Sequence, residues 1–335
     1  MLSKKIGIDL GTSTVLVYVK GEGIVVNEPS LVAVNRDGTR MLAVGRQAQE
    51  MIGRTPDGIS VVRPMREGVI ADFAVAEGML HHFIGKVQGR QRLFKPEVMI
   101  CVPSGVTSVE RRAVTAAAIS AGARQAWLID EPIAAAIGSD LPINQPRGHA
   151  VCVIGGGTTE LAVISLSGMV VARSVRVGGD RIDDAITAYL RRAHNLLVGE
   201  RTAEEIKIAT GAAVTMQEPL VGEARGRDLV TGLPRSVEVT SNEIVEAIHE
   251  PLAAIVGAVR SMLEETPPEL AADILDRGIL LSGGGAQLRG IDRFIAMHTG
   301  IPTLVADDPQ TSVVRGTGLA LENFEVLRRN QAYLR

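Results

Sequence analysis

Cysteine is scarce in this chain of 335 residues, and the two that it has, Cys101 and Cys152, each lie inside an apolar run. Disulfides persist in oxidising compartments, so nothing indicates a secreted, disulfide-stabilised domain, and we expect two buried reduced thiols. Long uncharged runs are also missing. No stretch reaches the roughly 18 residues that a membrane-spanning helix needs, and no secretory signal precedes the first strand at Lys5. We therefore expect a cytoplasmic protein that at most lies on a membrane surface.

Charge of one sign is not in excess either. Lys and Arg number 35 against 38 Asp and Glu, which gives a net charge of -3. Because no overall positive field attracts nucleic acid, we expect no nucleic-acid partner. With 46% apolar and 22% charged residues, the composition suits two medium-sized lobes with cores rather than a disordered or fibrous chain.

What the chain does contain is a repeated pattern of an apolar strand, a turn of glycine and hydroxyl residues, and a second apolar strand. The turn residues are Gly11, Thr12, Ser13 and Thr14 in the first copy and Gly155, Gly156, Gly157 and Thr158 in the second. Glycine lets backbone N–H groups approach an anion without interference from a Cβ atom, and Ser or Thr hydroxyls add donors. Two such turns predict two related lobes that hold a polyphosphate between them.

A third glycine turn, Gly283 to Ala286, follows an apolar strand at 278–281 and precedes a helical pattern. A helix N-terminus at this point can face a nucleoside. A single glycine turn is explained equally well as a tight hairpin. Three turns, two of them in equivalent positions, favour a nucleotide site instead.

Capping patterns predict helices in both lobes. Thr107 and Glu110 have the spacing of a capping box, the same pattern predicts a helix over Thr202 to Ala209, and Asp180 is expected to cap another. Short β-rich runs, the first of them Ile24 to Val26, predict a small insert on the first lobe. These elements make the chain an α/β protein.

The lobe boundaries follow from these elements and from the polar, proline-bearing segment that begins at Pro142. The first lobe is predicted to comprise residues 1–141 and 308–335, with a small insert at about 32–66. The second is predicted to comprise residues 142–307, with a small insert at about 181–240.

Five motifs occur in one order: Asp-x-Gly-Thr from Asp9, Glu-Pro from Glu131, Gly-Gly-Gly-Thr-Thr from Gly155, Thr-Ala-Glu-Glu-Ile-Lys from Thr202 and Gly-Gly-Gly-Ala from Gly283. This order resembles the superfamily of actin, sugar kinases and DnaK-type chaperone ATPases. Within it, the chain is similar to the MreB/Mbl family of bacterial actins over nearly its whole length. The phrases that carry this resemblance are Ile8–Thr12, Met51–Pro56, Arg63–Met65, Gly68–Asp72, Cys101–Gly105, Glu200–Glu204 and Thr311–Gly316.

The resemblance implies an actin-like fold, a duplicated ribonuclease H-like α/β fold of two lobes with a nucleotide cleft between them. It also implies ATP or ADP and Mg²⁺ as ligands, with Asp9 facing the metal through water. Both glycine turns would hold phosphate. The adenosine side would be formed by Glu204, Glu205, Ile206, Lys207, Gly283, Gly284, Gly285 and Ala286.

The resemblance further implies an ATPase in which Glu131 orients the attacking water and Thr158 assists. Phosphoryl transfer to water requires charge neutralisation and an aligned nucleophile rather than covalent chemistry, which agrees with these residue types. Two plainer interpretations stay open at this point. Glu131 could cap the helix that begins at Pro132, and Glu204 with Lys207 could be a surface i,i+3 ion pair.

One position departs from the family pattern. When Gly11 is aligned with Gly155, Val153 falls opposite Asp9, where the family normally carries Asp. An isopropyl group cannot hold the waters of a metal ion or an attacking water. We therefore expect nucleotide binding to survive better than turnover. Thr14 and Val15 are milder departures, at positions where the family usually has Asn and Thr.

Leu93 and Phe94 are two large apolar side chains in a loop that also carries Arg90, Arg92 and Lys95. Such a pair often packs into the core. The resemblance instead implies contact with the inner face of the cytoplasmic membrane, where each basic residue contributes on the order of 1 kcal/mol. Because one loop binds weakly, polymerisation would multiply the contact.

The function implied by the resemblance is a cytoskeletal one: membrane-associated filaments that organise cell-wall elongation and set cell shape. The expected partners are further copies of the chain, the membrane, and the wall-elongation proteins MreC, MreD and RodZ. The alternative is a monomeric sugar kinase or chaperone-type ATPase of the same superfamily. A kinase needs a further catalytic Asp and a sugar pocket, and we expect no peptide-binding domain within these residues.

Overall fold

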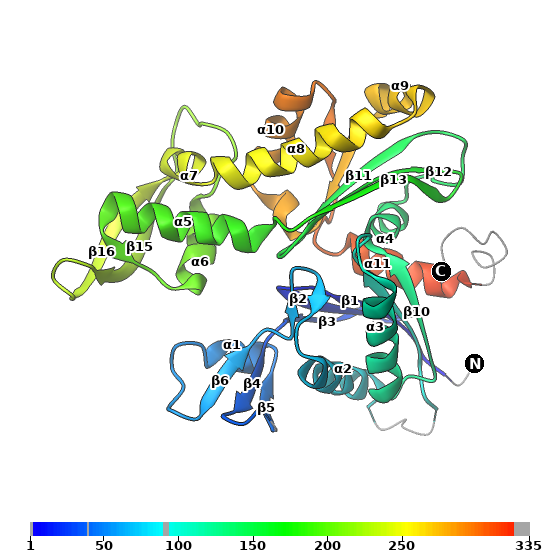
Figure 1. The fold of residues 1–335 in the computed structure, drawn as a ribbon, viewed down its shortest axis with the longest axis horizontal. Coiled ribbons are helices and arrows are strands. Elements are labelled where there is room, and N and C mark those ends of the chain that lie inside the picture. The colour runs from blue at the N-terminus through cyan, green and yellow to red at the C-terminus, as the bar shows by residue number, and fades with distance from the viewer. Residues whose placement is uncertain (1–2, 39, 90–93, 325–335) are drawn as a thin grey trace.

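The computed structural model describes residues 3–38, 40–89 and 94–324. Within these residues the chain forms two lobes, each built on a five-stranded mixed sheet (Figure 1). The first sheet has the order β10-β9-β1-β2-β3 and the second the order β13-β12-β11-β17-β18. The lobe boundaries expected from the sequence remain a prediction.

The first sheet is buried on both faces. Its strands are β1 (Lys5–Leu10), β2 (Thr14–Val19), β3 (Gly23–Pro29), β9 (Glu97–Val102) and β10 (Gln125–Asp130). In β9, Val98 and Ile100 pack with helices α2 (Phe73–Gln88) and α3 (Ser108–Ser120), while Met99 packs with α4 (Glu131–Gly138) and α11 (Ser312–Glu322). Side chains alternate between the faces of a strand, so the nearly continuous apolar run fills two cores.

The second sheet repeats the plan of the first. Its strands are β11 (His149–Ile154), β12 (Thr159–Ser165), β13 (Gly168–Val175), β17 (Ile279–Ser282) and β18 (Thr303–Val305). Strand β11 pairs antiparallel with β12 and parallel with β17, just as β1 pairs with β2 and β9. One face packs against helices of the second lobe, and the other packs against α4 and α11, so these two helices lie in a core shared by both sheets.

The remaining elements flank the two sheets. The other helices of the second lobe are α5 (Gly179–His194), α6 (Glu200–Thr210), α7 (Ser241–Ala247), α8 (His249–Glu265), α9 (Pro268–Arg277), α10 (Ile291–Thr299) and the 3₁₀ turn η1 (Gly284–Gln287). Its small sheet joins β14 (Leu196–Leu197), β15 (Val221–Asp228) and β16 (Pro234–Thr240). The first lobe adds α1 (Arg46–Glu50), β4 (Val32–Asn35), β5 (Met41–Val44), β6 (Ile59–Val62), β7 (Met65–Arg66) and β8 (Val69–Ile70).

Three local predictions were wrong and one is confirmed. The run Ile24–Val26 belongs to β3, which pairs with β2 in the main sheet rather than in an insert. Helix α5 begins after Gly178 and α6 after Gly199, so in the described chain neither Asp180 nor Thr202 forms the expected cap. Both caps failed because the helices start earlier than the pattern suggested. The capping box of Thr107 is present at α3.

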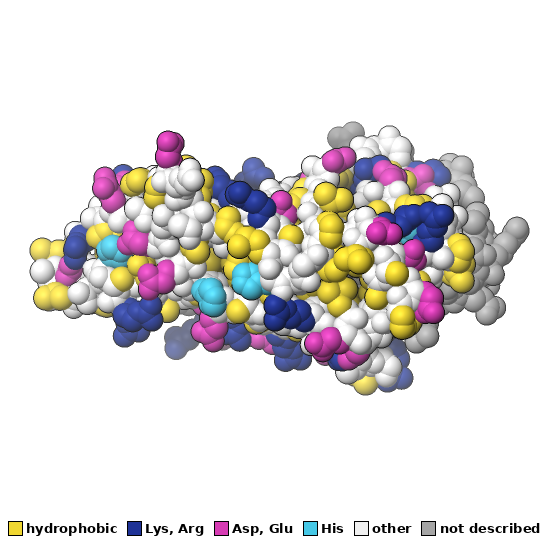
Figure 2. All heavy atoms as spheres, turned by 90° about the horizontal axis from the view of Figure 1, so that it is seen from above, with side chains coloured by type: hydrophobic (Ala, Val, Ile, Leu, Met, Phe, Trp, Pro, Cys, Tyr) yellow, Lys and Arg dark blue, Asp and Glu magenta, His cyan; other side chains and the backbone are white. Residues whose placement is uncertain are grey.

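The surface carries both signs of charge. Figure 2, which views the molecule from the side of α8, α9 and α10, shows Lys and Arg interspersed with Asp and Glu between apolar areas. No helix in the described ranges combines the length and apolar character needed to cross a bilayer.

Candidate functional site

A cavity of about 550 Å³ lies between the two lobes, where the three glycine turns meet. Ligand pockets typically span about 300–1,000 Å³, so the volume suits a small molecule. The turn residues that line it are Gly11, Thr12, Ser13, Thr14, Gly155, Gly156, Gly157, Thr158, Gly283, Gly284 and Gly285. The structure therefore brings all three predicted turns to one place.

The first two turns are geometrically equivalent. The N–H of Gly11 donates to the carbonyl of Thr14 at 3.0 Å, and the N–H of Gly155 donates to the carbonyl of Thr158 at 2.8 Å. Asp9 lies two residues before Gly11 and pairs with Leu16 of β2. Val153 lies two residues before Gly155 and pairs with Glu160 of β12 in the same way. The alignment made from the sequence is the one that the backbone adopts, and Val153 holds the place that Asp9 has in the first hairpin.

The two turns also touch across the cleft. A Cβ added to Gly156 would overlap the side chain of Ser13, and one added to Gly157 would lie 2.7 Å from the Thr12 hydroxyl oxygen. Only glycine allows this approach, because real Cβ atoms do not come so close to other atoms. The turns thus form one continuous bed of backbone amides and hydroxyls, which is a surface suited to an anion.

Asp9 supplies a partly buried carboxylate at this bed. Burial raises the pKa of Asp9 to about 6, and a hydrogen bond from the Cys101 thiol, at 3.2 Å, partly offsets the rise. A nearby cation would stabilise the charged form. Mg²⁺ usually keeps several waters and binds through one or two carboxylates plus substrate phosphates, so the Asp9 carboxylate beside a phosphate bed fits a nucleotide-borne Mg²⁺. No cluster of three metal-ligating side chains occurs in the described residues.

Glu131 lines the same cavity from the start of α4. Burial raises its pKa well above the usual range, and the negative charges of Glu160, Asp9 and Asp130 add to the rise. Among the described residues no side chain forms a cap bond for α4, so Glu131 does not act as its cap. Its carboxyl is instead available to the cavity.

Val153 forms an apolar part of the cavity wall. Its side chain is buried in the core that α4 and α11 share with both sheets, and it also lines the cavity. An Asp here would place a second carboxylate near Asp9. The valine leaves that part of the wall without a group that can hold water.

Of the residues predicted for the adenosine side, only some line the cavity. Glu204 and Lys207 of α6 line the cavity. Glu205 does not line it and pairs with Arg201 at 2.9 Å, while Ile206 is buried in the core of the second lobe. Ala286 is likewise buried in that core. A helix turns one face to a site, so consecutive residues cannot all reach it.

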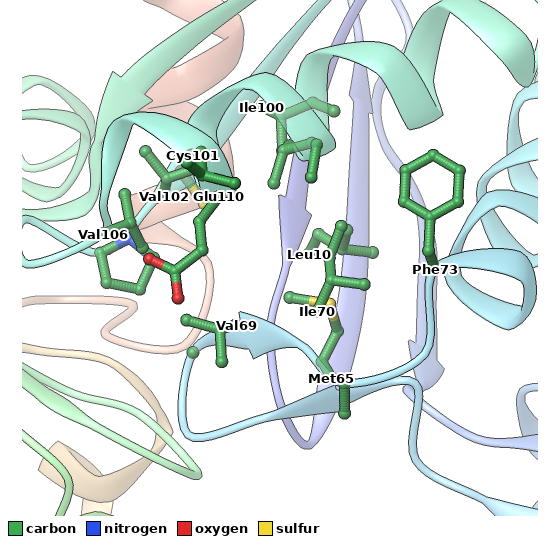
Figure 3. A pocket seen from close by; sticks show the side chains of 16 residues that line it. Leu10, Met65, Val69, Ile70, Phe73, Ile100, Cys101, Val102, Val106 and Glu110 are labelled. Carbon is green, nitrogen blue, oxygen red and sulfur yellow. The ribbon is translucent and has the colours of Figure 1, made fainter.

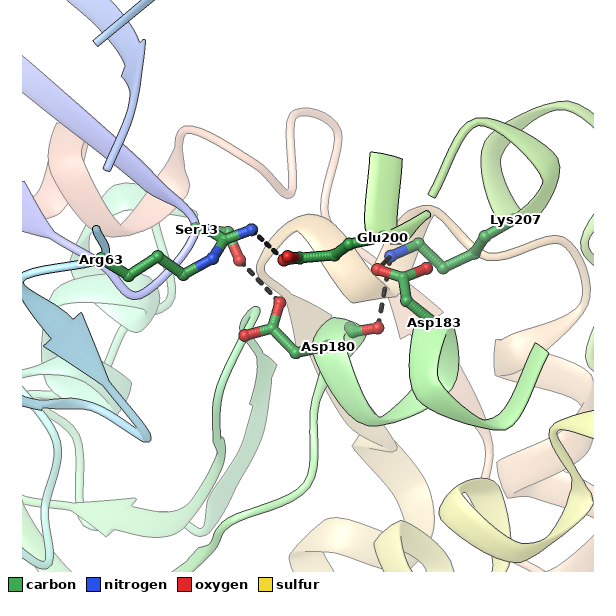
Figure 4. A network of polar contacts seen from close by, with 7 residues as sticks. Ser13, Arg63, Asp180, Asp183, Glu200 and Lys207 are labelled. Atoms are coloured by element: carbon green, nitrogen blue, oxygen red, sulfur yellow. Dashed lines mark hydrogen bonds and ion pairs between the residues drawn. The ribbon is translucent and has the colours of Figure 1, made fainter. Parts of the chain in front are cut away.

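Lys207 is held by a buried ion pair rather than by a surface pair. Its ammonium lies 2.8 Å from the Asp183 carboxylate and 3.3 Å from the carbonyl of Gly179 (Figure 4). Burial raises the pKa of Asp183 to about 7; the Lys207 charge opposes the rise, and Glu204 and Asp180 add to it. The i,i+3 interpretation is therefore wrong for Lys207, whose position is fixed by α5.

Sequence reasoning missed Asp180 as a site residue. Its carboxylate accepts a hydrogen bond from the Ser13 hydroxyl at 3.0 Å, across the cleft (Figure 4). The pattern of Gly178 and Gly179 before an acidic residue at a helix start could have indicated it. Other lining residues that were missed are Gly68, Ile182, Ile208, Gln287, Leu288, Arg289, Gln310 and Val313.

Ion pairs bridge the lobes at the mouth of the cavity. Arg63, between β6 and β7, pairs with Glu200 at the start of α6 (Figure 4). Arg176 pairs with Glu67 at 3.2 Å. Together with the bond from Ser13 to Asp180, these contacts link the two lobes across the cleft.

A smaller, apolar cavity of about 240 Å³ adjoins the phosphate bed. Figure 3 shows its lining of side chains from β7, β8, β9 and the start of α3. It shares Leu10 and Gly68 with the larger cavity, and Glu110 is the charged residue among its described lining. Its walls offer few groups for an anion, so the phosphate site is the larger cavity.

The predicted membrane loop is described only in part. Phe94 is 47% exposed, so it does not pack into the core. Leu93 lies outside the described residues.

Comparison with solved structures defines the class of fold. The crystal structure of MreB5 of Spiroplasma citri bound to ADP matches with a TM-score of 0.92 and 38% identity, over 98% of this chain and 99% of that chain. A MamK double helical filament matches with a TM-score of 0.82 at 22% identity, over 96% of this chain and 99% of that chain. The chain has the actin-like fold.

Comparison of sequences defines the family. The model of the family described as MreB/Mbl protein matches residues 3–329. The cell shape-determining protein MreB of Escherichia coli (strain K12) is 53% identical over 331 residues, which are 97% of this chain and 95% of that protein. Mbl of Bacillus subtilis (strain 168) is 47% identical over 331 residues, 99% of each chain. The chain belongs to the MreB/Mbl family.

Proposed function

We propose that this chain is an ATP-binding bacterial actin that polymerises into membrane-associated filaments and organises cell-wall elongation. The observation that carries the proposal is the single cavity lined by glycine turns from both lobes together with Asp9 and Glu131. Relatives named as cell shape-determining proteins support the cytoskeletal role. Neighbour structures bound to ADP and AMPPNP support nucleotide as the ligand.

The nucleotide would lie with its phosphates on the bed formed by Thr12, Ser13 and Gly156. Its nucleoside would lie toward Gly284 and Lys207, on the side where Ile208 also reaches the cavity. Because Asp180 now accepts the Ser13 hydroxyl, a phosphate that takes this hydroxyl must compete with that carboxylate. Closure of the lobes would then follow from contacts that one ligand makes to both turns.

Asp9 would hold the hydrated Mg²⁺ of the nucleotide, and the metal would neutralise phosphate charge during hydrolysis. Glu131 would orient the attacking water and Thr158 would assist through its hydroxyl. Burial raises the pKa of Glu131 and so disfavours its charged form, whereas a nearby cation would favour the charged form, which can accept a hydrogen bond from water. With Val153 in place of a carboxylate, we expect slow turnover.

Membrane binding would use Leu93 and Phe94, of which the exposed Phe94 is consistent with insertion into lipid. The protein would then lie on the inner face of the cytoplasmic membrane, with MreC, MreD and RodZ as partners. Repetition of one weak loop along a filament would give the avidity that a single copy lacks.

Concentration-dependent pelleting tests the proposal. With ATP and Mg²⁺, we expect the protein to remain in the supernatant below a threshold concentration and to pellet above it. A monomeric kinase or chaperone-type ATPase would show no threshold. Light scattering that stays at the monomer value over the whole concentration range, while ATP is bound, would overturn the filament proposal.

A further inference from the structure

Glu160 of β12 is a carboxylate with no solvent exposure, and none of the roles above uses it. It follows Thr158 by two residues and stands opposite Val153 in the ladder between β11 and β12. Side chains of directly opposed residues lie on the same face of a sheet, so Glu160 points to the side on which Val153 meets the cavity. A charged group in such a place requires partners, because burying an unpaired charge is very unfavourable.

The partners of Glu160 come from both lobes. The backbone N–H of Ser104, in the first-lobe loop between β9 and α3, donates to Oε2 at 2.9 Å. The hydroxyl of Ser174, on β13 of the second lobe, donates to Oε1 at 2.6 Å. The loop also packs closely here, because a Cβ added to Gly105 would lie 3.2 Å from the Cβ of Ser174. One carboxylate thus ties the two lobes together behind the phosphate bed.

The same carboxylate reaches the hydrolytic side of the cavity. Burial raises the pKa of Glu160, while hydrogen bonds from Ser174, Ser104 and the Thr158 side chain oppose the rise. Its charge is also the first electrostatic cause, after burial, of the raised pKa of Glu131. Glu160 does not line the cavity itself. Glu160 is therefore two residues from Thr158 in the chain, and its charge acts on Glu131.

We propose that Glu160 is a positioning residue for hydrolysis: its carboxylate holds the Ser104 loop of the first lobe against β13 and thereby sets the position of Thr158, two residues before it. The geometry of Thr158 then depends on lobe closure, because the Ser104 N–H comes from the first lobe. This inference rests on the proposed ATPase function. The position of Thr158 should matter more in this chain than in relatives with Asp at position 153, because Val153 cannot hold water and only Thr158 and Glu131 would orient it.

The test is Glu160→Gln. Glutamine keeps the size of the side chain but replaces one acceptor oxygen with an NH₂ donor, which faces donors already in place. We expect steady-state phosphate release at saturating ATP and Mg²⁺ to fall roughly 10-fold or more, by comparison with single contacts to the transition state that cost about 10²–10³. The Kd for ATP is expected to change by less than about threefold, since the substituted side chain does not line the cavity and the glycine amides of both turns stay in place.

Val163→Ala is the matched control. Val163 lies on the same strand but packs into the core on the other face, so its truncation weakens the lobe without reaching the cavity. It should lower Tm and leave both rate and Kd unchanged. The same comparison is made in the Val153→Asp background, where faster turnover is expected.

The outcomes separate two kinds of failure. Phosphate release by Glu160→Gln within twofold of its parent, in either background, would refute the positioning role, as would a loss of rate matched by an equal loss of ATP affinity. A parent that binds no ATP would instead refute the proposed function and, with it, the role of Glu160.

Discussion

Replacing Val153 with Asp should have opposite effects on the stability of the nucleotide-free protein and on its turnover. The valine side chain is 3% exposed and packs in the core shared by the lobes. Losing that apolar contact costs about 2 kcal/mol. The new carboxylate would also lie near Asp9, Glu131 and Glu160, whose charges disfavour its ionised form. We therefore expect Tm without nucleotide to fall by roughly 4–8 °C.

The rate of ATP turnover should rise in the same variant. The Asp would stand where the first hairpin has Asp9, at the edge of the phosphate bed, and could hold waters that an isopropyl group cannot. A single group that positions water or metal is worth about 10²-fold in rate, by analogy with single transition-state contacts. Phosphate release by Val153→Asp at saturating ATP and Mg²⁺, above the polymerisation threshold, should exceed that of the parent by about this factor.

Val153→Asn is the matched variant, because it has nearly the same size and can bind water but carries no charge. We expect it to lower Tm in a similar way and to raise the rate less than Asp does. Equal phosphate release by all three proteins would refute the reasoning. It would show that Glu131 and Thr158 suffice for hydrolysis and that Asp9 anchors the metal alone.

Three further predictions concern the site and the loop. Asp183, with its pKa raised to about 7 from 3.8, is protonated in the folded state at pH values where the unfolded chain has lost the proton. The free energy of unfolding of the nucleotide-free protein should therefore fall as pH rises from about 4 to 7. When urea titrations at several pH values measure this free energy, it should depend less on pH in Asp183→Asn than in the parent, and an unchanged pH dependence contradicts this. Gly156→Ala should abolish ATP binding in a fluorescent-nucleotide titration, because the added Cβ would overlap Ser13, and retained affinity contradicts the shared bed. Changing Leu93 and Phe94 together to Ser should abolish liposome co-sedimentation but leave solution filaments intact, and unchanged lipid binding argues against a membrane loop.

The glycine turns could be predicted from the sequence because they depend on local chemistry. Backbone approach to an anion requires glycine, and the spacing of Gly11 and Gly155 from the preceding strands fixed the alignment that the structure confirms. It was harder to predict which residues of a helix face the cavity. The motif at Glu204 to Lys207 is continuous in sequence, yet Glu205 and Ile206 turn away from the cavity.

Contacts between the lobes could not be predicted from one sequence. Asp180 lies 167 residues from Ser13, and Ser104 lies 56 residues from Glu160. A local sequence pattern cannot predict such contacts, because they depend on how the two sheets pack against α4 and α11. Asp180 was assigned to a helix cap for this reason, although its carboxylate reaches across the cleft.

The location of bound nucleotide tests the central claim most directly. A crystal structure of this protein with AMPPNP and Mg²⁺ should show the phosphates between Thr12 and Gly156, the nucleoside beside Gly284, and the metal hydrated against Asp9. Nucleotide density in the smaller apolar cavity, on the outer surface of either lobe, or nowhere at saturating ligand would contradict the account.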